Sequence, residues 1–235
     1  MKGYERYAAA RMFDNPVLEW GSKIHPATPF VVYGPLVLGL LGWGLASGTT
    51  QPLQVALWAT VGFVTWQWME YGLHRGFFHW EGSGPLTRRL HAIIHGYHHT
   101  YPDDGQRLVM PLGASVPLAL VIGAALWALH APSATLPFFC GLVTGYLAYD
   151  FIHYRVHHGG LPGAWGKALR ARHMAHHFNT PDKNFGISHM YLDVLFGTLR
   201  QRDTGPQRHD EPLPVVRVGV VVAVDDGVQP AGEGP

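Results

Sequence analysis

The chain has 235 residues, of which only 14% are charged, and its 16 histidines nearly equal its 17 Lys and Arg or its 16 Asp and Glu. An ordinary soluble domain carries roughly 25% charged residues, so this composition argues against a simple soluble globule. A formal net charge of +1 gives no strong field for nucleic acid, and nucleic-acid binding is excluded in practice. The single cysteine, Cys140, excludes a disulfide framework and a Cys-based zinc site.

Two long stretches of the sequence contain no charged residue. No Lys, Arg, Asp or Glu occurs from Ile24 to Met69 or from Leu108 to Tyr149, and each block is about twice the roughly 20 apolar residues that cross a bilayer. Each block predicts a helical hairpin, with spans at about 30–48 and 53–72, then at about 109–130 and 134–152. The short turn inside each hairpin holds no Lys or Arg, so the positive-inside rule places both termini and the histidine-rich loops in the cytosol.

We therefore predict an all-α integral membrane protein with four transmembrane helices in two hairpins and a cytosolic, helical, histidine-rich cap. Such a multi-pass protein would lie in a bacterial cytoplasmic membrane or in the endoplasmic reticulum. Residues 1–200 are expected to form one membrane domain. The tail, residues 201–235, contains a Val-rich run and a Gly- and Pro-rich end, and no role is assigned to it.

Most histidines fall into four clusters. Residues three or four apart share one face of an α-helix, so the histidines within a cluster can converge. His74 and His79 differ, because five steps of about 100° leave their side chains roughly 140° apart on a regular helix, and a distorted turn or a helix end is needed there. The clusters are His74 and His79; His91, His95, His98 and His99; His153, His157 and His158; and His173, His176 and His177.

The clusters are expected to meet at one membrane face, because the first begins where the second span ends and the third begins where the fourth span ends. Ten or more imidazoles exceed what one metal ion binds, so the cap is predicted to hold a dimetal site. Imidazole suits iron, zinc and copper alike, and the spacing does not choose among them. His25 and His130 at span edges and His209 in the tail are not expected to bind metal, and His189 stays unassigned.

Several stretches carry a pattern that extends beyond the histidines. They are His95–Pro111, in which HGYHH precedes Arg107-Leu-Val; Tyr149–Gly159; His173–Phe178; Phe185–Ser188, leading to Asp193 and Phe196–Leu199; and Phe13–Glu19. Together they resemble the fatty acid 2-hydroxylases within the membrane fatty acid hydroxylase and sterol desaturase superfamily. The resemblance covers about Phe13 to Arg200.

This resemblance implies a non-haem site with two iron ions that activates O2 and inserts one oxygen atom into a C–H bond of a lipid acyl chain, at C2 of a fatty acid or fatty acyl lipid. Zinc can take the place of iron in a purified sample. No catalytic residue is implied beyond the metal ligands. These ligands are His74, His79, His95, His98, His99, His153, His157, His173, His176 and His177.

Further residues are expected around the ligands. His91 and His158 match motif positions but are placed outside the metal ligands, and Asp104 and Asp150 are candidates for orienting ligand imidazoles through their free N–H. Arg107 is a candidate for pairing with Asp104 or holding an acidic headgroup of the substrate. Eukaryotic family members commonly carry a cytochrome b5 domain before the first span, for which the first 23 residues are too few. A separate electron donor, cytochrome b5-like or ferredoxin-like, is therefore expected.

Other functions remain open from the residues. The same site could desaturate a lipid, or hydroxylate a sterol or carotenoid. A non-enzymatic alternative is metal transport or storage, but transport favours ionisable ligands near the bilayer midplane, and the charge-free blocks hold only His25 and His130, at the edges of the spans. A haem cytochrome is disfavoured because facing histidines inside the spans are missing.

Overall fold

The computed structural model describes residues 11–200, so the predicted tail lies outside the described residues. Every regular element in this part of the chain is a helix. The elements are α1 (Pro16–Gly21), α2 (Thr28–Ala46), α3 (Pro52–Gly72), the π-helix η1 (Leu73–Phe78), α4 (Pro85–His91), the π-helix η2 (Ala92–Gly96), α5 (Tyr97–Thr100), α6 (Leu112–Trp127), α7 (Pro132–His158), α8 (Gly163–Phe178) and α9 (Tyr191–Leu195).

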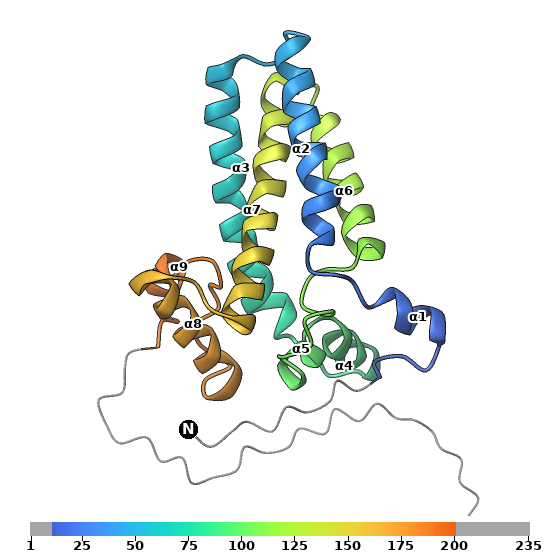
Figure 1. The fold of residues 1–235 in the computed structure, drawn as a ribbon, viewed down its shortest axis with the longest axis vertical. Helices are drawn as coiled ribbons and strands as arrows, with labels where there is room; N and C mark the ends of the chain where they lie inside the picture. Colours follow the sequence, from blue (N-terminus) through green and yellow to red (C-terminus); the bar gives the residue numbers. More distant parts are fainter. Residues whose placement is uncertain (1–10, 201–235) are drawn as a thin grey trace, which may run out of the picture.

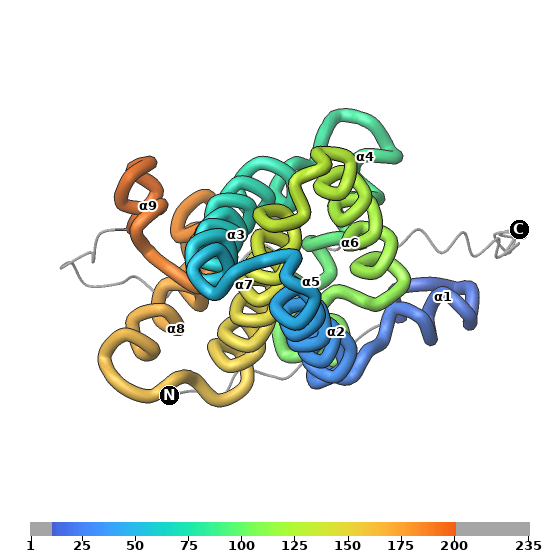
Figure 2. Tube along the Cα trace, turned by 90° about the horizontal axis from the view of Figure 1, so that it is seen from above, coloured from blue at the N-terminus to red at the C-terminus, as the bar shows by residue number. Residues whose placement is uncertain are grey.

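A column made of α2, α3, α6 and α7 stands on a base that contains α1, α4, α5, α8 and α9 (Figure 1). Seen from above, α7 lies in the middle of the column, with α3 on one side and α2 and α6 on the other (Figure 2). The buried core of the column joins Tyr33 and Val37 of α2 to Cys140, Val143 and Tyr146 of α7. The column thus holds α7, whose last turns reach the base, in a fixed position.

Helices occupy all four predicted spans, but their ends differ from the prediction. Proline begins several of them, as Pro52 does in α3 and Pro132 in α7, because its fixed φ suits the first turn and its missing N–H would be unpaired there anyway. The helix α6 starts after Pro111 and has only 16 residues. The helix α7 continues to His158, six residues beyond the predicted end, so the third histidine cluster belongs to the same helix as the fourth span.

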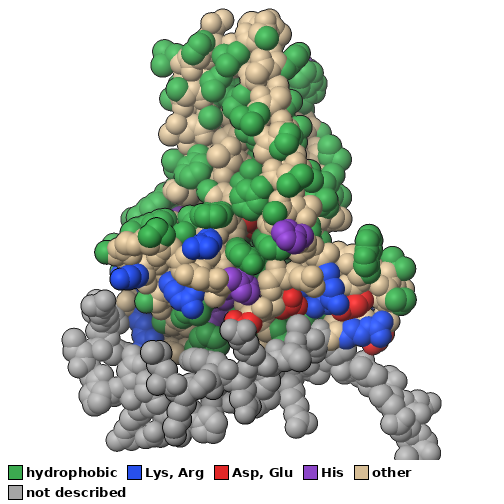
Figure 3. Space-filling model, viewed as in Figure 1, with side chains coloured by type: hydrophobic (Ala, Val, Ile, Leu, Met, Phe, Trp, Pro, Cys, Tyr) green, Lys and Arg blue, Asp and Glu red, His purple; other side chains and the backbone are tan. Residues whose placement is uncertain are grey.

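Two of the described helices, α2 and α7, are long and apolar enough to cross a membrane, and α6 is a shorter apolar helix. Hydrophobic side chains are spread over the visible face of the column, whereas the charged side chains on that face gather in the base (Figure 3). Leu38, Leu53 and Leu120 are 72%, 80% and 67% exposed. Apolar surface on this scale indicates contact with lipid rather than with water, as in a membrane protein.

The helices α3 and α7 approach each other through glycine. A Cβ atom at Gly62 would lie 2.1 Å from the carbonyl oxygen of Phe138, and one at Gly141 would lie 2.0 Å from that of Ala59. Small residues at a helix crossing allow the two backbones to come close, a common feature of helix pairs in membranes. This contact fixes the position of α7 relative to α3, and both helices lead into the histidine clusters.

Candidate metal centre

The distorted turn predicted between His74 and His79 is a π-helix. Helix α3 runs directly into η1, where backbone hydrogen bonds join residues five apart, so that side chains five apart come to lie on one face. The Nε2 atoms of His74 and His79 are 3.3 Å apart. A second π-helix, η2, carries His95 and leads into α5 with His98 and His99.

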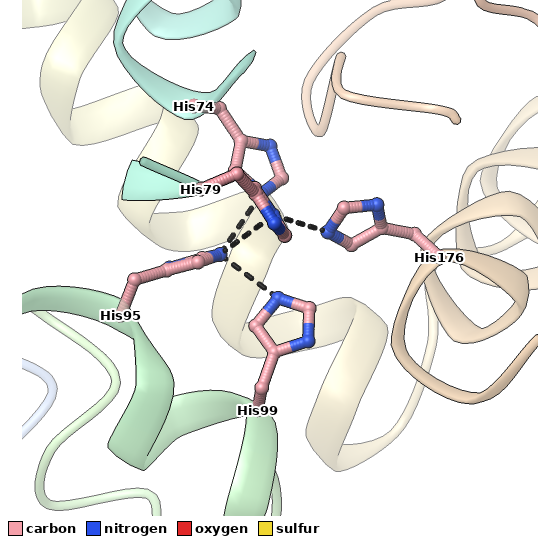
Figure 4. A group of neighbouring side chains, drawn as sticks. All are labelled: His74, His79, His95, His99 and His176. Carbon is pink, nitrogen blue, oxygen red and sulfur yellow. Dashed lines mark hydrogen bonds between the residues drawn. The ribbon is translucent and has the colours of Figure 1, made fainter. Parts of the chain in front are cut away.

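Five histidines from these elements and from α8 form the first histidine group, made of His74, His79, His95, His99 and His176. Their rings point toward a common centre (Figure 4). The Nε2 atom of His95 lies 3.1 Å from that of His74 and 2.9 Å from that of His99. The Nε2 atoms of His79 and His176 are 3.0 Å apart.

These short distances cannot all be ordinary hydrogen bonds. The Nδ1–H group of His74 donates to the carbonyl oxygen of Phe185 at 2.6 Å, and that of His176 donates to the carbonyl oxygen of Lys183 at 2.7 Å. In a neutral imidazole with Nδ1 protonated, Nε2 carries only a lone pair. The Nε2 lone pairs of His74 and His176 therefore both point into this group, an arrangement that a cation stabilises.

The same packing keeps the imidazoles neutral. Burial lowers the pKa of His79 to about 3, and repulsion from His176 and His91 adds to the effect. Burial also holds the pKa of His74 and of His95 well below the usual value for histidine. A neutral imidazole is the form that binds a metal ion, so the group needs no deprotonation near pH 7 before it can bind one.

A second histidine group lies beside the first, and it consists of His98, His153, His157, His173 and His177. The Nε2 atom of His173 lies 3.1 Å from that of His153, 2.8 Å from that of His157 and 3.1 Å from that of His177. The ring centroids of His99 and His177, one from each group, are 4.2 Å apart. The two groups thus form one continuous cluster with two centres.

Both groups fit metal ions of the kind that imidazole binds. Within each group the ligand atoms lie within 4.8 Å of one another, and most of the rings are buried. A set made only of nitrogen donors suits iron, zinc or copper. The ten histidines that the sequence analysis assigned as ligands are the same ten that the structure divides between the two groups.

The backbone carbonyl groups that orient the first group belong to the loop 183–189, which two buried carboxylates hold. Asp193 accepts hydrogen bonds from the amides of Phe185 and Gly186 at 2.8 and 2.9 Å. Glu70, in the last turn of α3, accepts from the amides of Ile187 and Ser188 at 2.7 and 2.8 Å. Orienting a metal-binding imidazole through its second nitrogen is a general feature of metal sites.

The pattern of residue types in the sequence did not predict a role for the loop 183–189. A carbonyl oxygen leaves no mark in the sequence, because every residue has one. Glu70 did leave a signal, since it is the first acidic residue after the long charge-free block and precedes His74 by one helical turn. Asp193 was noted only for its family resemblance.

The residues expected around the ligands lie close to the two groups. The Nδ1–H group of His91 donates to the carbonyl oxygen of Phe78 at 2.7 Å, and the ring of His158 packs on Tyr154. Neither belongs to a histidine group. Within the described residues, Oδ2 of Asp150 and Nδ1 of His153 are both buried without a hydrogen bond, so the orienting role of Asp150 stays a prediction.

Asp104 and Arg107 pair with each other rather than with an imidazole. Nη1 of Arg107 donates to Asp104 at 2.8 Å and to the hydroxyl oxygen of Tyr97 at 2.9 Å. The Arg107 side chain is only 3% exposed and forms a further ion pair with Glu19 of α1. Two carboxylates therefore take up its charge, which favours attachment of α1 to the base over capture of a headgroup.

Glu19 completes this ion-pair network. Burial alone would raise the pKa of Glu19, but hydrogen bonds from Lys23, from the amides of Phe13 and Met12 and from Arg107 lower it to about 2. The carboxylate is therefore ionised at neutral pH and ties the segment before α2 to the base.

The remaining histidines lie apart from the two groups. His189 is buried, and its Nε2–H group donates to the carbonyl oxygen of Gln67 at 3.1 Å. His25 is hydrogen-bonded to the amide of Ala27, and His130 donates to the carbonyl oxygen of Ala128. His209 lies outside the described residues.

Comparison with known proteins gives a consistent answer. The fatty acid hydroxylase family model matches residues 59–198, more than half of the chain. A dihydroceramide fatty acyl 2-hydroxylase of Arabidopsis thaliana is 36% identical over 168 residues, which cover 72% of this chain and 70% of that protein. The fatty acid 2-hydroxylase of Homo sapiens is 32% identical over 215 residues, which cover 80% of this chain and 56% of that protein.

A solved structure shares the fold. Full-length scs7p, of which only the hydroxylase domain is visible, superposes with a TM-score of 0.75 and 30% sequence identity over 83% of this chain and 74% of that chain. The resemblance read from the histidine motifs is thereby confirmed. The chain belongs to the fatty acid hydroxylase family and is an enzyme of the hydroxylase type, an oxidoreductase of lipid metabolism.

Proposed function

We propose that this enzyme hydroxylates C2 of a fatty acid or fatty acyl lipid, with O2 as co-substrate and two iron ions held by the ten histidines. The observation that carries the proposal is the pair of largely buried groups, each of five histidines, at the foot of an apolar column. Relatives at 36% and 32% identity are named as 2-hydroxylases of a dihydroceramide acyl chain and of fatty acids.

The iron ions, when bound, would supply the activation of O2 and the insertion of one oxygen atom into the C–H bond. The protein itself would supply the metal ligands and the groups that orient them. Nε2 atoms face the two centres, while the carbonyl oxygens of Phe185 and Lys183 keep the protons of His74 and His176 on Nδ1. Because His74, His173 and His176 are almost fully buried, bulk water is kept away from the reacting atoms, which limits side reactions.

The column would cross the membrane. We propose that α2, α3, α6 and α7 all span it, with the base and the histidine groups in the cytosol. With a rise of about 1.5 Å per residue, α6 is ~24 Å long, somewhat shorter than the roughly 30 Å apolar layer. Apolar residues at both of its ends, such as Leu108 and Val109 before it and Leu129 after it, extend its apolar length.

The substrate would approach from the bilayer, with its headgroup at the cytosolic surface and its acyl chain along the column. This orientation brings the carbon next to the carboxyl or amide group to the level of the histidines. An acyl chain of a free fatty acid and one attached to a sphingoid base present the same C2 methylene. Analysis of the hydroxylated lipids shows which of these two substrates the enzyme uses.

The test compares cells that express the protein with cells that express the His176→Ala variant. Appearance of 2-hydroxyacyl lipids only with the unchanged protein supports the proposal, and the lipid class that carries them identifies the substrate. A product that has lost two hydrogens, or an oxidised sterol or carotenoid, refutes it. Purified protein supplied with a cytochrome b5-like or ferredoxin-like donor tests whether a separate protein provides the electrons.

A further inference from the structure

An apolar cavity lies in the column, apart from the metal centre. It lies between α6 and α7, beside α2 and α3, and has a volume of about 50 Å³ with an almost entirely apolar wall. Met110, Ser115 and Tyr146 line its end nearest the base, and Ala119, Ile122 and Phe139 line its middle and far end. Leu118 in its wall is 45% exposed, so the cavity opens toward the outside of the column, and its apolar wall suits an apolar ligand.

The cavity lies in line with the second histidine group. Phe139, Val143, Tyr146, Asp150 and His153 follow each other along α7 at steps of three or four residues, so they share one face of the helix. Aromatic rings lie beside this face: the ring centroids of Tyr149 and His153 are 5.5 Å apart, and those of Trp66 and Tyr146 are 5.3 Å apart. The buried side chains of Tyr146 and Asp150 lie between the cavity and His153 on this face, so a chain that runs from the metal centre to the cavity would pass alongside them.

The length of the path can be compared with an acyl chain. Fourteen residues separate His153 from Phe139, which corresponds to about 21 Å along the helix axis. An extended hydrocarbon chain advances by about 1.3 Å per carbon, given a C–C bond of about 1.5 Å and tetrahedral angles. The far end of the cavity is therefore about 16 carbons from the metal centre, or a chain of roughly 16 to 18 carbons.

From this geometry we infer that the cavity receives the methyl end of the acyl chain, and that Ala119, Ile122 and Phe139 set the preferred chain length. The inference rests on the proposed function and names the substrate more narrowly. A volume of about 50 Å³ holds a few carbons and no ring system, so the occupant is the tip of one chain.

The first test changes the depth of the cavity. Ala119→Phe fills its middle, at the level of Val143, and shifts the product toward chains shorter than about 14 carbons, whereas Ile122→Ala deepens the far end and shifts the product toward longer chains. A pocket of this kind discriminates by roughly tenfold or more per methylene, so the ratio of short to long 2-hydroxy products from a mixed set of saturated fatty acids changes at least tenfold. Val121→Phe and Val121→Ala are the matched controls, because Val121 lies on the same helix and is 67% exposed.

The second test does not depend on turnover. A fatty acid of about 16 carbons with a diazirine at its methyl end is added to the purified protein and illuminated, and the labelled residues are located by mass spectrometry. Label on Ile122 or Phe139, lost in Ala119→Phe and kept in Val121→Phe, supports the inference. Label only outside the cavity overturns it.

The two proposals fail in different ways. If the unchanged protein makes no hydroxylated acyl lipid, the proposed function is wrong, while the labelling experiment still decides whether a chain enters the cavity. If it makes 2-hydroxy products whose chain-length profile is the same in Ala119→Phe, Ile122→Ala and the unchanged protein, the function stands and the cavity does not select the chain.

Discussion

Asp193 allows a quantitative test of how the loop 183–189 supports the metal centre. Its carboxylate is 1% exposed and accepts three hydrogen bonds, from the amides of Phe185 and Gly186 and from the hydroxyl of Thr198. In Asp193→Asn one acceptor oxygen becomes an NH2 group that faces a backbone N–H. A hydrogen bond to a charged group contributes about 1.5–3 kcal/mol, and burying an unpaired amide costs a similar amount, so we expect a loss of about 2–4 kcal/mol in the free energy of unfolding.

The metal should respond as well. Displacing Phe185 moves the carbonyl oxygen that holds the Nδ1–H group of His74, and such changes next to a ligand typically cost 10- to 100-fold in metal affinity. The effect should be largest in the first histidine group, so the bound metal falls from two ions toward one per chain. Metal titration with elemental analysis, together with thermal unfolding, measures both quantities.

Two matched variants sharpen this test. Asp182→Asn removes an exposed carboxylate just before the loop and should change little. Glu70→Gln should also be mild, because the side-chain oxygen can still accept from Ile187 and Ser188, while its NH2 group can donate to the Ser188 hydroxyl. An Asp193→Asn protein that binds two metal ions with unchanged affinity would refute this account of the loop.

Three further predictions concern packing, ion pairing and pH. Gly141→Ala should lower the melting temperature by several degrees, because its Cβ would lie 2.0 Å from the carbonyl oxygen of Ala59 and the two helices must move apart; an unchanged melting temperature would contradict the close approach. Arg107→Ala should cost about 1.5–3 kcal/mol of stability, since it removes the charge-assisted hydrogen bonds to Glu19 and Asp104 while Glu19 keeps Lys23 and two backbone amides, yet metal content should persist; unchanged stability with weaker substrate binding would instead favour the headgroup role. In metal-free protein, the unfolded state takes up protons near pH 6.5, whereas the pKa of folded His79 is about 3, so stability should fall as pH decreases from about 6.5 toward 3. Thermal unfolding at pH 7.5 and 5.5 checks this, with His79→Gln showing a smaller decrease, and a melting temperature that rises on acidification would refute it.

The sequence predicted the helices well where composition alone decides. A long apolar block leaves few alternatives to a helical hairpin, so α2, α3, α6 and α7 appear in the four expected places. Their ends depend on local contacts, and α7 continues past the expected boundary at residue 152 because helical turns cross from apolar to polar residues without interruption. The membrane topology rests on the charge pattern and stays a prediction.

The sequence predicted those parts of the metal centre that are formed by side chains. Imidazoles at helical spacing on one side of a protein indicate a metal centre. The odd spacing of His74 and His79 indicated a distorted turn or a helix end, without specifying a π-helix. The division into two groups was not predictable, because it depends on how α5 and α8 are turned relative to each other. The orienting carbonyl groups were invisible for a different reason, since they belong to the backbone.

Neighbouring residues of α5 and α8 serve different metal groups. His98 and His99 point to the second and the first group, and His177 and His176 do the same from α8. Metal at one centre would therefore restrict the very turns of backbone that carry ligands of the other. Since such coupling is reciprocal, an ion bound at either centre would change the metal affinity of the other centre by the same factor.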